Sequence, residues 1–246
     1  MGADAALLLL ADSRLPAGGH AHSGGVEEAV RLGAVTGTGD LARFLRGRLA
    51  TAGLVTAALA AAACELAAAG ELAATDDPAD DPADGVELWR RLDAEADARA
   101  ASPAQREAAR TQGRLLLRTA RRMWPSAALD TLARAVPEGP HHPVALGAAG
   151  ASAGCTPRQA ALAAAYTSVT GPATAAVRLL GLDPVTVHRL LADLAPALDD
   201  AAHAACASLG DATQQGRWHA LPGHSAPALD LLAEGHLTNP MKLFVS

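Results

Sequence analysis

The feature that most constrains the fold is the run LVTAALAAAACELAAAGELAA, at residues 54–74, which is made almost entirely of alanine and leucine. Alanine has the highest helix propensity, and the run lacks the alternating β-branched and aromatic residues that are typical of strands. Half of the chain is apolar but only six residues are aromatic, so the core must consist of alanine, leucine and valine. We therefore predict an all-α protein, a single-domain helical bundle of about eight to ten helices over residues 1–246.

Start and stop signals place several helices in the first third of the chain. A first helix is expected over residues 3–11, ending at a proline- and glycine-rich segment, and a second over about 26–32. Asp40 is the expected N-cap of a third helix, because it follows the helix-breaking sequence TGTG. This helix should run to about Ala69, with a weak point at Gly53.

Further signals divide the rest of the chain. The segment TDDPADDPADG, at 75–85, carries five aspartates and two prolines, so it predicts an exposed acidic loop. Ser102 and Thr156 each begin a capping-box sequence with proline at the first helical position, which indicates the start of a helix. The pair Gly171-Pro172 is expected to break the second of these helices, since proline lacks the backbone N–H of a helix interior.

Composition excludes several classes of function. A net charge of −6 and a pI near 5.8 argue against a nucleic-acid-binding protein, which needs a basic surface. Lys242 is the one lysine, so no phosphate-binding GK[ST] loop exists. The N-terminal run AALLLLA and the apolar run from Ala52 to Cys64 are too short to cross a membrane. Three widely spaced cysteines fit a reducing compartment, and we expect a soluble cytoplasmic protein.

The glycine-rich segment, residues 12–25, reads DSRLPAGGHAHSGG and allows three interpretations. A phosphate loop would need a lysine and a preceding strand, and the segment has neither. His20 and His22, with Ser23, could offer ligands to nickel or zinc, but two imidazoles in a loop make only half of a metal site. A structural or partner-contacting role is therefore favoured, with no tightly bound metal and no cofactor. No G-x-S-x-G or H-E-x-x-H motif indicates catalysis.

Two charged features could bind partner proteins. The helix expected after Ser102 carries arginine at every fourth position, which places the side chains in a slowly winding stripe. The stripe suits an acidic partner, or it is a solvated face whose arginine stems cover apolar neighbours. Lys242, Leu243 and Phe244 offer a second anchor on a chain end that can become ordered when it docks. The stripe consists of Arg106, Arg110, Arg114, Arg118 and Arg122.

The N-terminal sequence LLLLADSRLPAGGHAHSGGVEEAV resembles the corresponding segment of the urease accessory protein F family. In that family a leucine-rich helix is followed by a serine, LP-x-G, two aromatic or histidine positions, S-x-G and a helix with glutamate. The similarity continues through REAARTQGRLLLRTA, through HPVALGAAGASAGCTPRQAALAAAYTSVTGPATAAVRLLGLDP and into the tail MKLFVS. The matching N-terminal positions are Ser13, Leu15, Pro16, Gly18, His20, His22, Ser23, Gly25 and Glu27.

The resemblance implies a non-catalytic, all-helical scaffold that forms homodimers. Such a protein would bind urease accessory protein D, also called H, and recruit the accessory GTPase G, so that GTP hydrolysis is coupled to nickel insertion into apo-urease. An alternative is a nickel-binding metallochaperone that uses His20 and His22. The expected partner-binding residues are Pro16, Gly18, His20, His22, Ser23, Gly25 and Glu27 from the resemblance, and Arg110, Arg114, Lys242, Leu243 and Phe244 from the charge pattern.

Overall fold

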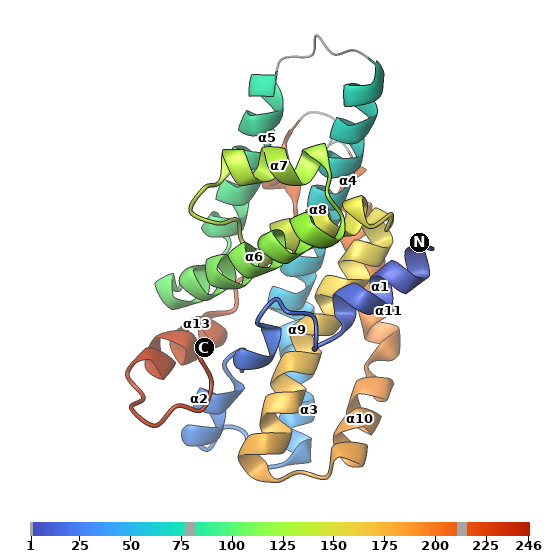
Figure 1. Ribbon diagram of the computed structural model, residues 1–246. Coiled ribbons are helices and arrows are strands. Elements are labelled where there is room, and N and C mark those ends of the chain that lie inside the picture. Colours follow the sequence, from blue (N-terminus) through green and yellow to red (C-terminus); the bar gives the residue numbers. More distant parts are fainter. Residues whose placement is uncertain (1, 77–81, 211–215) are drawn as a thin grey trace.

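The computed structural model describes residues 2–76, 82–210 and 216–246, and it confirms the all-α prediction (Figure 1). These residues contain no strand, and their helices slightly outnumber the eight to ten expected. The helices are α1 (Ala3–Ala11), α2 (Val26–Arg31), α3 (Thr38–Arg48), α4 (Leu54–Asp76), α5 (Pro82–Ala98), α6 (Pro103–Met123), α7 (Ala127–Ala135), α8 (His142–Ser152), α9 (Pro157–Leu180), α10 (Pro184–Asp193), α11 (Ala195–Ala207) and α13 (Pro227–Leu237). Single helical turns lie at Gly19–Ala21 (η1), Leu49–Gly53 (η2) and Trp218–Ala220 (η3).

Helix α4, formed by the alanine-rich run, is the centre of the packing. It contacts α8, α9 and α11, and its alanines from Ala57 to Ala63 are almost completely buried. Small side chains let the neighbouring helices approach closely, so that Gly147 of α8 lies directly against the backbone of Ala60. Because the helices lie close together, backbone atoms and methyl groups fill the interior, and large aromatic side chains are not needed.

The stretch Thr38–Glu71 is the one described helical stretch long and apolar enough to cross a membrane by length and composition. It joins α3, η2 and α4 and therefore exceeds the Ala52–Cys64 run considered in the sequence analysis. In its most apolar window, with a mean hydropathy of 1.8, 61% is buried inside the protein. That burial is typical of the core helix of a folded domain, so the stretch is weak evidence for a membrane span.

The expected break at Gly171-Pro172 is wrong, because α9 continues through both residues. Proline at position 172 removes the N–H that would donate to the carbonyl of Ser168, four residues earlier. Arg48, at the end of α3, supplies the missing donor: its Nε lies 2.8 Å from the Ser168 carbonyl oxygen. A side chain 120 residues away in sequence thus provides the hydrogen bond that the Ser168 carbonyl would otherwise lack. The helix continues where the local sequence predicts its end.

The other predicted helix breaks and N-caps are only partly found in the structure. The weak point at Gly53 is a turn of π-helix, η2, which connects α3 to α4 without ending the helical path. Asp40 does not cap α3 from outside; it lies in the first turn, and its carboxylate accepts hydrogen bonds from Thr36. Thr156 forms the full capping box at α9. At α6, Ser102 caps the helix, but its own N–H is bound by Asp230.

Of the acidic loop expected at 75–85, residues 77–81 lie outside the described residues, and the loop prediction is wrong for 75–76 and 82–85, which are helical. The flanking helices are longer than expected at this point, since α4 extends to Asp76 and α5 begins at Pro82. Single-domain organisation over residues 1–246 stays a prediction.

Candidate functional site

The glycine-rich segment connects α1 to α2 through a tight path that depends on glycine. Gly18, Gly24 and Gly25 have φ values of 77°, 60° and 90°, which side chains with a Cβ atom resist. At Gly18 a Cβ atom would also lie 2.8 Å from the Leu115 side chain of α6. The Thr119 hydroxyl, again on α6, donates to the Pro16 carbonyl. The segment is therefore a fixed connection packed against α6.

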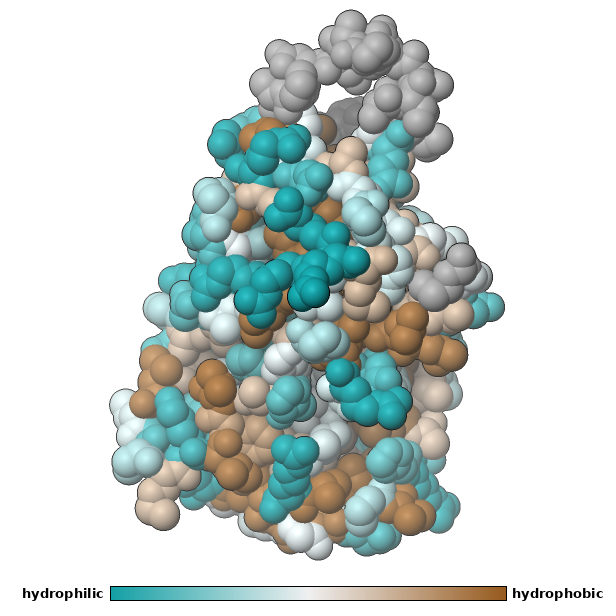
Figure 2. All heavy atoms as spheres, viewed as in Figure 1, coloured by the Kyte–Doolittle hydropathy of each residue, from teal (hydrophilic) through white to brown (hydrophobic). Residues whose placement is uncertain are grey.

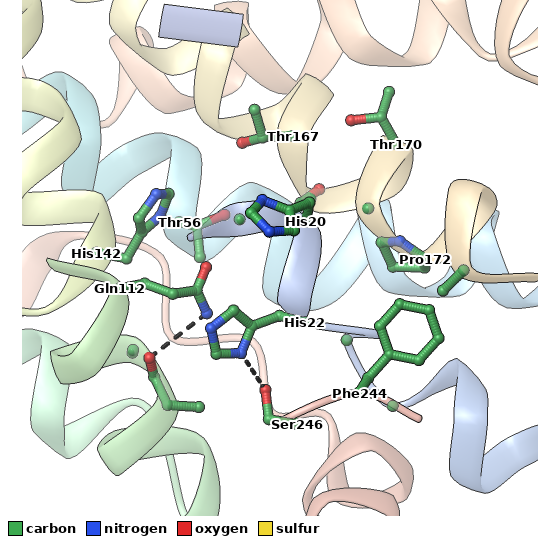
Figure 3. Close-up of a pocket in the computed structure, with 18 of the residues that line it drawn as sticks. His20, His22, Thr56, Gln112, His142, Thr167, Thr170, Pro172, Phe244 and Ser246 are labelled. Carbon is green, nitrogen blue, oxygen red and sulfur yellow. Dashed lines mark hydrogen bonds between the residues drawn. The ribbon is translucent and has the colours of Figure 1, made fainter. Parts of the chain in front are cut away.

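The C-terminal tail, residues 238–246, is folded back onto the glycine-rich segment. The Val245 N–H donates to the Ala21 carbonyl at 2.8 Å, and the Ser23 N–H donates to the Ser246 carbonyl at 2.5 Å. His22 Nδ1 lies 2.6 Å from the Ser246 hydroxyl (Figure 3). From its sequence, the tail is expected to be a chain end that becomes ordered on docking to a partner. In the structure it is already docked, on this chain.

Glu27 is the residue that holds the tail at its other end. Its carboxylate accepts hydrogen bonds from the backbone N–H of Leu243 at 2.5 Å and of Phe244 at 3.1 Å, and from His236 Nε2 at 2.8 Å. Burial, the largest single influence, opposes ionisation, but these hydrogen bonds outweigh it and hold the pKa of Glu27 below its ordinary value. The carboxylate is therefore ionised at neutral pH and fixes the start of α2, α13 and the tail to one another.

A cavity of about 910 Å³ opens between the glycine-rich segment, the tail and helices α6, α8 and α9. His20, His22 and His142 all line it, with His142 contributed by the start of α8 (Figure 3). Burial, reinforced by the neighbouring imidazole, lowers the pKa of His22 and of His142 to about 4. Both imidazoles are then neutral at physiological pH. Other lining residues labelled in Figure 3 are Thr56, Gln112, Thr167, Thr170, Pro172, Phe244 and Ser246.

The histidines could contact a metal ion only in part. Neutral imidazoles are good ligands for nickel and zinc. Within the described residues, however, no three histidine, cysteine, aspartate or glutamate side chains are grouped closely enough to hold an ion together. His142 is not among the site residues expected from the sequence. Only the fold shows that it shares a cavity with His20 and His22.

The arginine stripe on α6 is not a uniform surface. Arg110 faces the interior and pairs with Asp93 at 2.9 Å and Asp97 at 3.0 Å, both on α5. Asp93 is in turn bonded to the backbone N–H and Nδ1 of buried His141. Arg114, four residues on, is about half exposed and donates to the Glu138 carbonyl. Both arginines thus make contacts within the chain, but Arg110 is largely buried whereas Arg114 lies at the surface.

The outward side of the tail and α13 exposes apolar side chains. Phe244 is buried, whereas Lys242 and Leu243 are exposed. Figure 2 shows hydrophobic surface gathered at the lower left, where Figure 1 places α13 and the C-terminus. The exposed apolar side chains of α13 and the tail are Leu231, Leu237, Met241, Leu243 and Val245, which are 56–88% exposed, and we call this group the tail patch. Exposed apolar side chains that gather on one part of a surface are typical of sites that contact other proteins.

Comparison with known proteins finds relatives that match nearly the whole chain. A protein-family model described as UreF matches residues 35–195, more than half of the chain. The chain is 47% identical over 240 residues to the urease accessory protein UreF of Mycobacterium sp. strain JLS, which covers 98% of this chain and 97% of that relative. The chain belongs to the UreF family. Similar UreF proteins come from Mycolicibacterium vanbaalenii, at 44% identity, and Mycobacterium tuberculosis H37Rv, at 42%, each covering 98% of both chains.

These relatives matter for the site because their similarity extends over nearly the whole chain. The family model itself begins at residue 35 and ends at residue 195, so it includes neither the glycine-rich segment nor the C-terminal tail. The 98% coverage reaches beyond both of those limits. The resemblance first noted in the N-terminal segment is thereby confirmed at the level of the family. The individual roles of the segment's residues stay predictions.

Proposed function

We propose that this UreF-family chain is a non-catalytic, cytoplasmic scaffold for the maturation of urease. In this role it binds accessory protein D, also called H, and recruits the accessory GTPase G, so that GTP hydrolysis is coupled to nickel insertion into apo-urease. The scaffold acts as a homodimer. The observation that carries the proposal is the tail patch, because it presents apolar side chains beside a segment that the fold holds rigidly.

The backbone contacts of the tail explain how it can serve as a docking surface. Glu27 and the glycine-rich segment bind the backbone of residues 243–246, so the side chains on the opposite side are held outward. A partner that covers Met241 and Leu243 would remove their apolar surface from water without first ordering the tail. Lys242 lies between them and adds a cation suited to an acidic partner.

The docking role predicts that outward substitutions weaken capture of accessory protein D. In Met241→Asp/Leu243→Asp, two desolvated carboxylates would oppose the contact, and we expect the amount of D captured in a pull-down to fall at least about tenfold. Capture of GTPase G, measured with and without GTP, should fall in the same variant if G joins after D.

The matched control is Val185→Asp, on α10, where the side chain is 76% exposed. This change adds one negative charge, against two in the double variant, at an apolar position of comparable exposure, so capture should stay at the wild-type level. If both variants retain D, with helix content unchanged by circular dichroism, the tail patch is not the docking surface.

A second candidate function, nickel binding by the chain itself, is favoured by the convergence of His20, His22 and His142 on the cavity. We propose only a transient nickel contact there, since water would have to complete most of the coordination shell. Equilibrium dialysis should give a dissociation constant of about 1 µM or weaker, and His22→Ala/His142→Ala should weaken it further. His203→Ala, an exposed histidine on α11, is the control and should have no effect. Stoichiometric submicromolar binding would instead support the metallochaperone.

A further inference from the structure

Arg48 is a partly buried arginine whose charge has no counterpart in the described part of the chain. Its Nε donates to the Ser168 carbonyl and its Nη1 donates to the Gly24 carbonyl, both at 2.8 Å. No carboxylate of a described residue lies within ion-pair distance of it, in contrast to Arg99 and Arg110, which are each paired with an acidic side chain. A guanidinium group has five N–H donors, so these two bonds leave three without a hydrogen-bond acceptor among the described residues.

Irregular backbone surrounds this guanidinium from three directions. The π-helical turn Leu49–Gly53 follows Arg48 directly, and π-turns within α-helices occur frequently at functional sites. Pro172 interrupts the hydrogen bonding of α9 at the carbonyl that Arg48 binds. On the third side Gly24 has a positive φ, and a Cβ atom there would lie 3.2 Å from Nη2. Three elements are thus shaped so that they converge on one cation.

The surroundings of Arg48 disfavour its charged form. Burial lowers the pKa of Arg48 to about 10, and no acidic neighbour offsets that effect. The side chain is still protonated at neutral pH, so the fold retains a positive charge whose hydrogen-bond partners among the described residues are two neutral carbonyl groups. Burying a charge without a counter-ion is unfavourable, and an anion that pairs with it would recover part of that free energy.

Arg48 also lines the cavity described above, which gives a small solute access to this region. The two acidic side chains that line the cavity are already engaged, Asp12 with Arg14 and Glu107 with Arg114. We propose that Arg48 anchors a binding site for a small carboxylate-type anion within this cavity. A planar carboxylate matches the planar guanidinium, whose unused N–H groups can donate to both of its oxygens. This inference does not depend on the proposed role in urease maturation.

The test is binding of formate to the full-length protein, with chloride replacing formate at constant ionic strength. We expect saturable binding with a dissociation constant on the order of 1 mM, as suits one charge-assisted contact, and no effect of chloride. Arg48→Met should weaken formate binding at least about tenfold. Arg178→Met is the matched control, because Arg178 lines the same cavity but is exposed and should contribute less than twofold.

Because Arg48→Met also removes bonds to Ser168 and Gly24, a second measurement uses the unaltered protein. In protein labelled with 15N-arginine, formate should shift one side-chain Nε–H resonance, assigned to Arg48 through its proximity to Pro172. Saturable binding with this single shift supports the site. The proposal is overturned if formate does not bind saturably, if the shifted resonance belongs to another arginine, or if Arg178→Met abolishes binding while folded Arg48→Met retains it.

Discussion

Gly147→Ala should destabilise the protein by about 3 kcal/mol, since the added Cβ atom cannot be accommodated between α8 and α4. It would lie 2.1 Å from the Ala60 carbonyl oxygen and 2.7 Å from the Ala63 Cβ atom, both on α4. Backbone cannot rotate away as a long side chain can, so the two helices would have to separate. Urea denaturation followed by circular dichroism measures the change in the free energy of unfolding.

The control for this prediction is Gly150→Ala, on the same helix. There the nearest atom to the new Cβ would be the Ala160 Cβ, at 3.4 Å, which is ordinary contact. Because alanine favours a helix over glycine by about 0.5–1 kcal/mol, this variant should be neutral or slightly more stable. Equal destabilisation by both substitutions would show that the contact with Ala60 is not the cause, and equal tolerance would show that α4 and α8 are not closely packed at Gly147.

The contrast between these two glycines illustrates what the sequence can predict. The alanine-rich composition of residues 54–74 predicts helices and close packing, and both are found. It does not identify which glycine meets a neighbouring backbone, because that depends on how α4 and α8 cross. The failure at Pro172 has the same origin: the donor that compensates it belongs to Arg48, and no local pattern connects the two positions.

The candidate site was predictable to a similar extent. Glycines and histidines in residues 12–25 stand out against the alanine-rich background, and Glu27 belongs to the family pattern. The partner of Glu27 was not predictable, because His236 and the tail are more than 200 residues away in sequence and carry no motif that pairs with it. His142 and Arg48 were missed for the same reason, since their chemistry appears only when three or more helices meet.

Arg110→Glu should destabilise the protein by about 3 kcal/mol or more, whereas Arg114→Glu should cost less than about 1 kcal/mol. Arg110 is 19% exposed and bridges Asp93 and Asp97, so its replacement removes the guanidinium that both carboxylates share and places a third carboxylate beside them. Arg114 is 47% exposed and pairs at 3.5 Å with Glu107, itself 70% exposed, and such surface pairs contribute little. Urea denaturation of both variants at equal ionic strength compares their free energies of unfolding.

The same two variants test whether the arginine stripe binds a partner protein. If the stripe binds accessory protein D through its exposed members, Arg114→Glu should remain folded and capture less D, and moderate salt should reduce the difference from wild type. Arg110→Glu would then lose capture only together with stability. A stable Arg110→Glu protein that fails to capture D would contradict the structural role given to Arg110, because its charge would then act at the interface rather than between α5 and α6.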